Sequence, residues 1–208
     1  MSHGGSDRVE VIGTGTAQVR PDLFVAQLGA EATGPDVATV LEAAELAVAA
    51  MAGAARAGGA GDADVRTTDV TVATNYGPTG PDGYRAAIGL GLTLHDLESA
   101  GTVLAEVVAA GGDASRVHAV SMTVADPHPA LDAAREAAFA DARHQAEQLA
   151  GLAGRTLGGV RRVTPQQVFN SFARAAAVQE QSKPLSAVPI EAGAATLTVS
   201  LLVRFDLD

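Results

Sequence analysis

The first residues that could do chemistry are two closely spaced glycines, Gly13 and Gly15, in the stretch VEVIGTGTAQVRPD, residues 9–22. Glycines at the mouth of a loop let backbone N–H groups close on a phosphate. Such a loop must open a helix, whereas the next segment alternates with a period of two, which indicates a strand. Gln18 also stands where a dinucleotide motif has its third glycine. We therefore predict two strands joined around a bend at the glycines, with Pro21 and Asp22 interrupting the second.

A second candidate is the loop DPHP, in which Asp126 and His128 could hold a metal ion. Catalytic zinc usually needs three protein ligands, and the five histidines show neither H-x-x-x-H nor H-E-x-x-H spacing. His118 shares a strand pattern with Val120 and Met122, and we expect it to be a hydrogen-bonded core residue. Asp126 and His128 remain weak candidate ligands, because they supply two side chains where three are usual. No metal or other cofactor is therefore predicted.

Nucleophilic and acid–base arrangements are missing from the sequence. Ser121 and Ser171 have no G-x-S-x-G context, and there is no cysteine, which excludes disulfides and thiolate nucleophiles. Glu136 and Asp141 are five residues apart on a predicted helix and so lie about 140° apart around its axis. We therefore expect no catalytic residues, and a chain that is not an enzyme.

The charge balance argues against nucleic acid as a partner. Acidic residues number 24 and basic residues 14, for a net charge of −10, and there is no tryptophan to stack on bases. The start MSHGGSDR lacks the features of a secretory signal, and no window approaches the ~18 consecutive apolar residues of a membrane span. The chain is expected to be soluble and cytoplasmic as written, or periplasmic or secreted if a leader was removed.

The elements that position these residues follow from hydrophobic periodicity. Apolar residues recur every three or four positions over residues 36–57, 97–110 and 130–153, which predicts three helices, the last rich in alanine. Runs of strand character surround them, including two around the Gly/Pro loop 77–83 and a long terminal strand. The predicted order is β-β-α-β-β-α-β-α-β-β, an α+β fold with helices packed on a largely antiparallel sheet.

The domain organisation is predicted from composition. Residues 1–8 are expected to form a disordered tail, and residues 9–208 one domain that alternatively divides into two subdomains. Residues 169–186 have weak periodicity and many Gln, Ser and Ala residues, so we predict a flexible insertion there.

Four stretches, in order, resemble the SIMPL-domain family, which includes the periplasmic immunogenic proteins of Gram-negative bacteria. They are IGTGTAQVRPD, GYRAAIGLGLTLHDLESAGTVLAEVVAAGG, LDAAREAAFADARHQAEQLAGLAGRTLGGV and PIEAGAATLTVSLLVRFDL. The family pattern joins a G-x-G…PD strand to an alanine helix ending in LG and to a final P-I-x-x-G strand. The matching residues here are Gly13, Gly15, Pro21, Asp22, Gly158, Pro189 and Gly193. The resemblance implies a fold without an established catalytic site, ring-like or cage-like homo-oligomers, and an association with envelope or oxidative-stress phenotypes in bacteria.

We therefore expect a non-enzymatic protein that self-assembles through strand edges, the 77–83 hairpin loop and alanine-rich helix faces. One alternative is a small-molecule or metal-binding protein, or an unrecognised hydrolase, with its site near Asp126, His128 and the 77–83 loop. Another is an adaptor that contacts a protein partner through residues 169–186.

Overall fold

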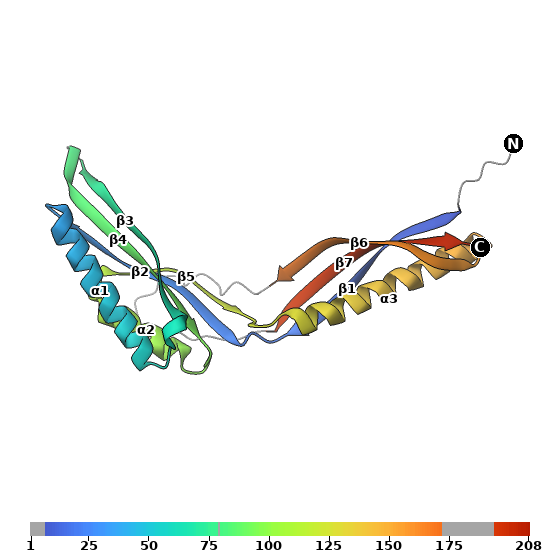
Figure 1. Cartoon of the computed structure of the whole chain (residues 1–208), viewed down its shortest axis with the longest axis horizontal. Helices are drawn as coiled ribbons and strands as arrows, with labels where there is room; N and C mark the ends of the chain where they lie inside the picture. Colours follow the sequence, from blue (N-terminus) through green and yellow to red (C-terminus); the bar gives the residue numbers. More distant parts are fainter. Residues whose placement is uncertain (1–6, 79, 172–193) are drawn as a thin grey trace. The chain divides into compact units, whose positions relative to one another are not determined.

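The computed structural model describes residues 7–78, 80–171 and 194–208. Seven strands and three helices in this part follow one another in the predicted order, which confirms the α+β fold (Figure 1). The strands are β1 (Arg8–Val19), β2 (Leu23–Gly34), β3 (Val65–Gly77), β4 (Gly80–Leu94), β5 (Ser115–Thr123), β6 (Leu157–Ser171) and β7 (Ala195–Leu207). The helices are α1 (Val37–Ala57), α2 (Ala100–Gly111) and α3 (His128–Leu152), with short 3₁₀ turns η1 (Asp62–Asp64) and η2 (Gly112–Ala114).

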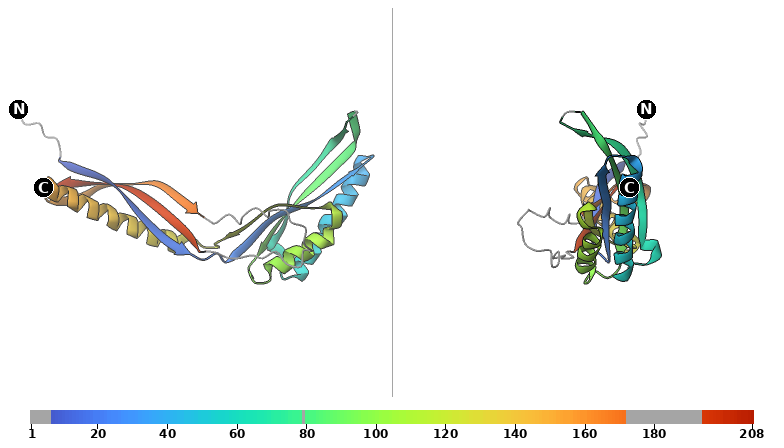
Figure 2. Two further views of the ribbon diagram at one scale, coloured as in Figure 1. Left: turned by 180° about the vertical axis from the view of Figure 1, so that it is seen from behind. Right: turned by 90° about the vertical axis from the view of Figure 1, so that its left-hand side faces the viewer.

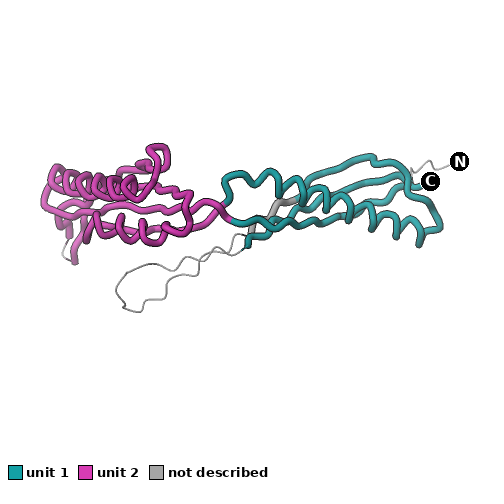
Figure 3. Tube along the Cα trace, turned by 90° about the horizontal axis from the view of Figure 1, so that it is seen from below, with its two compact units in different colours: residues 1–20, 124–173, 193–208 teal, residues 21–123, 174–192 magenta. Residues whose placement is uncertain are grey.

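The chain divides into two compact units, coloured separately in Figure 3. Unit 1 comprises the described parts of residues 1–20, 124–173 and 193–208, and therefore contains β1, α3, β6 and β7. Unit 2 contains β2 to β5 with α1 and α2, all from the continuous segment 21–123. Each unit has a core of its own.

Unit 1 is an antiparallel sheet, sheet A, in the order β1-β7-β6, with α3 along one face (Figure 2). Alternate residues of β7 are buried beneath α3, namely Ala195, Leu197, Val199, Leu201, Val203 and Phe205. The ring centroids of Phe139 from α3 and Phe205 lie 6.4 Å apart in the same core. The predicted terminal strand is confirmed, but it needs no partner subunit because β1 and β6 pair with its two sides.

Unit 2 is a four-stranded antiparallel sheet, sheet B, in the order β3-β4-β2-β5. On one face of it, α1 packs against β2 and β4, and α2 packs against α1 and β5 (Figure 2). The period of two predicted for β2 is confirmed, since the buried apolar residues of this strand are Phe24, Ala26, Leu28 and Ala30. The opposite face of sheet B carries no helix of the described chain.

Helix ends explain the small differences from the predicted bounds. Asp36 caps α1, its Oδ1 accepting the backbone N–H of Thr39 at 3.0 Å. The second helix starts at Ala100 rather than Leu97, because Asp96 accepts bonds from the Glu98 N–H and the Ser99 hydroxyl and so holds a turn there.

The predicted seven-residue hairpin loop is wrong. β3 and β4 continue into it and stay paired as far as Gly77 and Gly80. Gly80 and Gly83 have φ of +128° and +80°, which glycine adopts without strain. The connection between the two strands is therefore shorter than the predicted loop of residues 77–83. Of the predicted insertion, residues 169–171 belong to β6 and residues 172–186 lie outside the described residues, as do residues 1–6, Pro189 and Gly193.

By length and composition alone, α1 is long and apolar enough to cross a membrane. Its buried residues nevertheless form one stripe against sheet B, comprising Val40, Ala44, Val48, Met51 and Ala55. Glu42 and Glu45 lie on the exposed side. This division into a buried and a charged face is typical of a helix that covers a core.

Candidate functional site

Gly13 and Gly15 lie in the middle of β1, where α3 packs directly on the strand. A Cβ atom on Gly13 would stand 2.0 Å from the carbonyl oxygen of Ala138, and one on Gly15 would stand 2.1 Å from that of Ala134. Five alanines spaced four apart form the facing stripe of α3 and are almost fully buried: Ala134, Ala138, Ala142, Ala146 and Ala150. The glycine bend is therefore wrong, because β1 runs unbroken through both residues and the glycines instead permit close helix–strand packing.

The outer edge of β1 is closed by two polar side chains of α3. Thr14 donates its backbone N–H to Oδ2 of Asp141 (2.8 Å), and Nε2 of Gln145 donates to the Ile12 carbonyl (3.2 Å). Gln145 also donates to Oδ2 of Asp141 (2.9 Å). The Thr14 N–H, followed by the Gln145 amide, lowers the pKa of Asp141 below its ordinary value of 3.8. The middle of this sheet edge is thus already hydrogen-bonded within the chain.

The remaining residues singled out in the sequence make local contacts. Asp22 donates its backbone N–H to the Thr123 carbonyl at 3.0 Å, where β2 begins. Gly158 lies in β6, where an added Cβ would stand 3.0 Å from Cβ of Asp206. Oδ1 of Asp126 accepts the backbone N–H of His128 at 3.0 Å, which forms an Asx turn at the start of α3. Among the described residues, no group of three or more acidic, histidine or cysteine side chains could hold a metal ion.

His118 is not the core residue that the strand pattern predicts. The pairing of β2 with β5 shifts between Gln27 and Leu28, which makes His118 the extra residue of a β-bulge. The bulge turns the imidazole to the face without helices, where its Nε2 would lie 3.2 Å from a Cβ added to Gly29. The His118 side chain is therefore exposed.

Three of the four sheet edges carry features that discourage strand addition. The edge of β1 is closed by α3, as described above. The edge strand β6 contains Pro165 and three register shifts. The edge strand β5 is short and bulged, and it carries Arg116 beside His118.

The fourth edge, that of β3, also shows register shifts, one of them between Thr74 and Tyr76, but its sequence protects it less. From Val70 to Tyr76, with the sequence VTVATNY, it carries no charged residue and no proline. The side chains of Val70 and Tyr76 are 57% and 73% exposed, because the described helices do not cover this end of sheet B. Long, uncharged and apolar edges of this kind pair readily with another strand.

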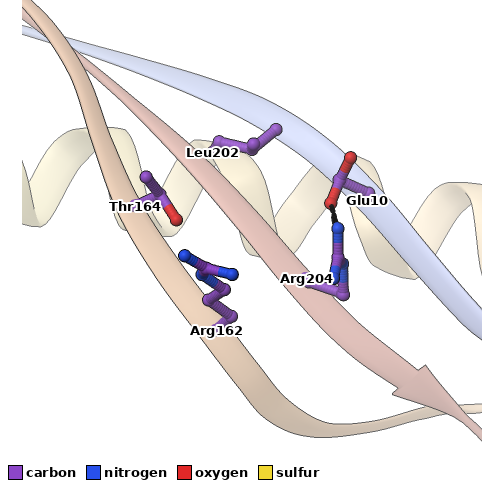
Figure 4. Close-up of a pocket in the computed structure, with 5 residues that line it drawn as sticks. All are labelled: Glu10, Arg162, Thr164, Leu202 and Arg204. Atoms are coloured by element: carbon purple, nitrogen blue, oxygen red, sulfur yellow. Dashed lines mark hydrogen bonds and ion pairs between the residues drawn. The ribbon is translucent and has the colours of Figure 1, made fainter.

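A cluster of arginines occupies the face of sheet A that α3 leaves uncovered. Arg162 and Arg204 stand directly opposite each other on β6 and β7, and they line a hollow of about 240 Å³ together with Glu10, Thr164 and Leu202 (Figure 4). A second hollow, of about 220 Å³, is lined by Arg8, Arg161, Arg162, Arg204 and Asp206. We call the six charged residues of these hollows (Arg8, Arg161, Arg162, Arg204, Glu10 and Asp206) the arginine cluster.

Ion pairs hold part of this cluster in place. Nε of Arg204 donates to Oε2 of Glu10 at 2.7 Å, and Nε of Arg161 donates to Oδ2 of Asp206 at 2.7 Å. The guanidinium of Arg162 makes no hydrogen bond or ion pair with any described residue. Sequence reasoning missed this cluster. The alternation of β7 could have placed Arg204 and Asp206 on one face, but the register shift between Val160 and Arg162, which brings Arg161 to the same face, has no signature in the sequence.

Comparison with known proteins agrees with the resemblance noted in the sequence. The model of the SIMPL family, described as "Protein of unknown function (DUF541)", matches residues 9–205. Proteins described as "Uncharacterized protein YggE" from Escherichia coli K12, Escherichia coli O157:H7 and Shigella flexneri are each 29% identical over 160 residues, which is 74% of this chain. The match covers 64% of the length of each of these relatives. The chain therefore belongs to the SIMPL family.

Proposed function

We propose that this chain is a non-enzymatic SIMPL-domain protein that forms a homo-oligomer, with the β3 edge as its primary contact. The observation that carries the proposal is the outer edge of the uncharged segment Val70–Tyr76, beside which no described strand lies. The alanine stripe of α3, also expected to serve assembly, packs against β1 within the same chain. The strand edge is therefore the better-supported contact. A stress-related role for the assembly rests on the family resemblance alone.

The segment is self-complementary when two copies meet antiparallel about a two-fold axis at Ala73. In that register Val70 lies opposite Tyr76 of the other copy, Val72 lies opposite Thr74, and Thr71 lies opposite Asn75. Aromatic and β-branched residues form favourable cross-strand pairs, and no like charges are brought together. The two four-stranded sheets would become one continuous sheet. A ring or cage needs at least one further contact of a different kind, because a two-fold contact alone closes at a dimer.

The absence of cysteine from the chain allows a direct test by cross-linking. About the proposed axis, the two Ala73 Cα atoms would stand about 4.5–5.5 Å apart, within the range that a disulfide spans. We expect Ala73→Cys to form a covalent dimer under mild oxidation, as seen on non-reducing gels. The matched control, Ser121→Cys on the exposed edge strand β5, should stay monomeric on the same gels.

Light scattering coupled to size-exclusion chromatography gives the second measurement. Thr71→Lys places a charge on the proposed contact and should lower the mass of the assembly, while Ser121→Lys should leave it unchanged. Circular dichroism and the melting temperature report whether each variant still folds. A wild-type chain that is monomeric at micromolar concentration would refute the proposal. So would an assembly whose mass survives Thr71→Lys and in which no single cysteine across Val70–Tyr76 forms a cross-link.

A further inference from the structure

The arginine cluster has more positive charge than its own acidic residues neutralise. Its four arginines face only Glu10 and Asp206, which leaves two positive charges in excess on a chain whose net charge is −10. Arg162 and Arg204 are paired directly across β6 and β7, and like charges in such positions destabilise a sheet unless an anion lies between or beside them. The cluster thus combines an electrostatic cost with an unused hydrogen-bonding group, the Arg162 guanidinium.

The geometry of the larger hollow suits an oxyanion. The Arg162 guanidinium and the Thr164 hydroxyl come from β6, and the Arg204 guanidinium comes from β7 (Figure 4). Glu10 accepts a hydrogen bond from Arg204 and fixes its position (Figure 4). A guanidinium presents parallel N–H donors that match the oxygens of phosphate or carboxylate.

The charge excess favours phosphate over carboxylate. Glu10 and Asp206 already pair with Arg204 and Arg161, so the two positive charges in excess belong to Arg162 and Arg8, and a single carboxylate would neutralise one of them. A phosphoryl group with one ester bond, or inorganic phosphate, carries a charge close to −2 at neutral pH and has at least three acceptor oxygens. We propose that the arginine cluster on sheet A binds a doubly charged phosphoryl group through Arg162, Arg204 and Thr164.

Such a group has two sources, a soluble phosphate compound or the headgroup of a lipid. The soluble arm of the experiment titrates the full-length chain with inorganic phosphate and with glycerol 3-phosphate, using chloride of equal ionic strength as the blank. The lipid arm measures sedimentation with vesicles of phosphatidylcholine, with and without phosphatidic acid. Binding in the soluble arm identifies a soluble compound as sufficient, and binding confined to phosphatidic acid vesicles identifies a headgroup.

Arg162→Gln is the decisive variant, because it removes the guanidinium that has no partner among the described residues. We expect it to weaken phosphate binding about tenfold, the loss of one charge-assisted hydrogen-bonding group. Arg143→Gln is the matched control, since Arg143 is an exposed arginine of α3 that pairs only with Glu147, and it should bind as the wild type does.

Three results would overturn the inference: no binding in either arm, equal loss in the two arginine variants, or an effect of succinate as large as that of phosphate. Nuclear magnetic resonance supplies an independent readout, because the amide of Thr164 should shift with phosphate in the wild type. Thr71→Lys, which tests assembly through β3, should leave phosphate binding unchanged, and Arg162→Gln should leave the oligomer mass unchanged. Failure of one proposal is therefore distinguishable from failure of the other.

Discussion

Gly13→Ala should destabilise unit 1 far more than a single methyl group ordinarily does. The new Cβ would lie 2.0 Å from the Ala138 carbonyl oxygen and 2.5 Å from the Ala142 backbone nitrogen, whereas Cβ atoms essentially never approach closer than 3.0 Å. These are backbone atoms of a helix, so no side chain can rotate away. The helix must retreat by about 1 Å, and a gap of that size forfeits a quarter to a half of each dispersion contact along it.

The expected cost is about 3 kcal/mol, at the upper end of what overpacking costs in protein cores. With a slope of about 2 kcal/mol per molar urea, the midpoint of unfolding should fall by about 1.5 M. Urea titration followed by circular dichroism measures this shift directly. Gly151→Ala, in the helix α3 that covers Gly13, is the matched control, since no atom lies within 4 Å of the Cβ position of Gly151. It should raise the free energy of unfolding by up to about 1 kcal/mol through helix propensity.

A free energy of unfolding for Gly13→Ala within about 0.5 kcal/mol of wild type would refute this account of the glycine. A second test uses the double variant Gly13→Ala with Ala142→Gly. Because the closest contacts of the new Cβ are with backbone atoms, removing the Ala142 methyl should restore little stability. Full restoration would mean that side-chain crowding, rather than the close approach of the helix backbone, explains the position.

Two further predictions concern polar contacts at element ends and edges. Asp141→Ala should lower the free energy of unfolding by about 1 kcal/mol at pH 7, because the Thr14 N–H loses its acceptor. Since the pKa of Asp141 is lowered in the folded state, its contribution is present above 3.8 and is lost as the pH falls through the lower folded value. Urea midpoints of wild type and variant should therefore converge in acid, and a gap independent of pH would contradict the assignment. Asp36→Ala should lower the urea midpoint by uncapping α1, because the Thr39 N–H loses its acceptor. Ser99→Ala should cost less in the same titration, because Ser99 makes no capping bond to α2.

Local pattern was sufficient to predict the element order and most of the core. Buried Phe24, Ala26, Leu28 and Ala30 follow from a period of two in β2, and the stripe of α1 follows from a period near 3.6. The first helix was predicted to begin at residue 36, one residue before the observed start of α1, and Asp36 proves to be its cap.

Contacts between distant segments were not predictable in this way. The role of Gly13 depends on α3, more than 120 residues later, and nothing near the glycine indicates that a helix covers it. His118 was misplaced because one extra residue in β5 reverses the face of the side chain, and neither partner strand shows the register shift in its own sequence. Arg161 and Arg162 reach one face of sheet A for the same reason.

The strand order of sheet A also bears on how the protein is made. β7 is the central strand of its sheet and follows both β1 and β6 in the chain, so these two strands have no partner in the sheet until β7 has been synthesised. Unit 2, drawn from one continuous segment, can fold while the rest is still being translated. Arg8 of β1 and its register partner Asp206 of β7 are likewise separated by almost the whole of the sequence. Unit 2 can therefore be complete while unit 1 still lacks its central strand.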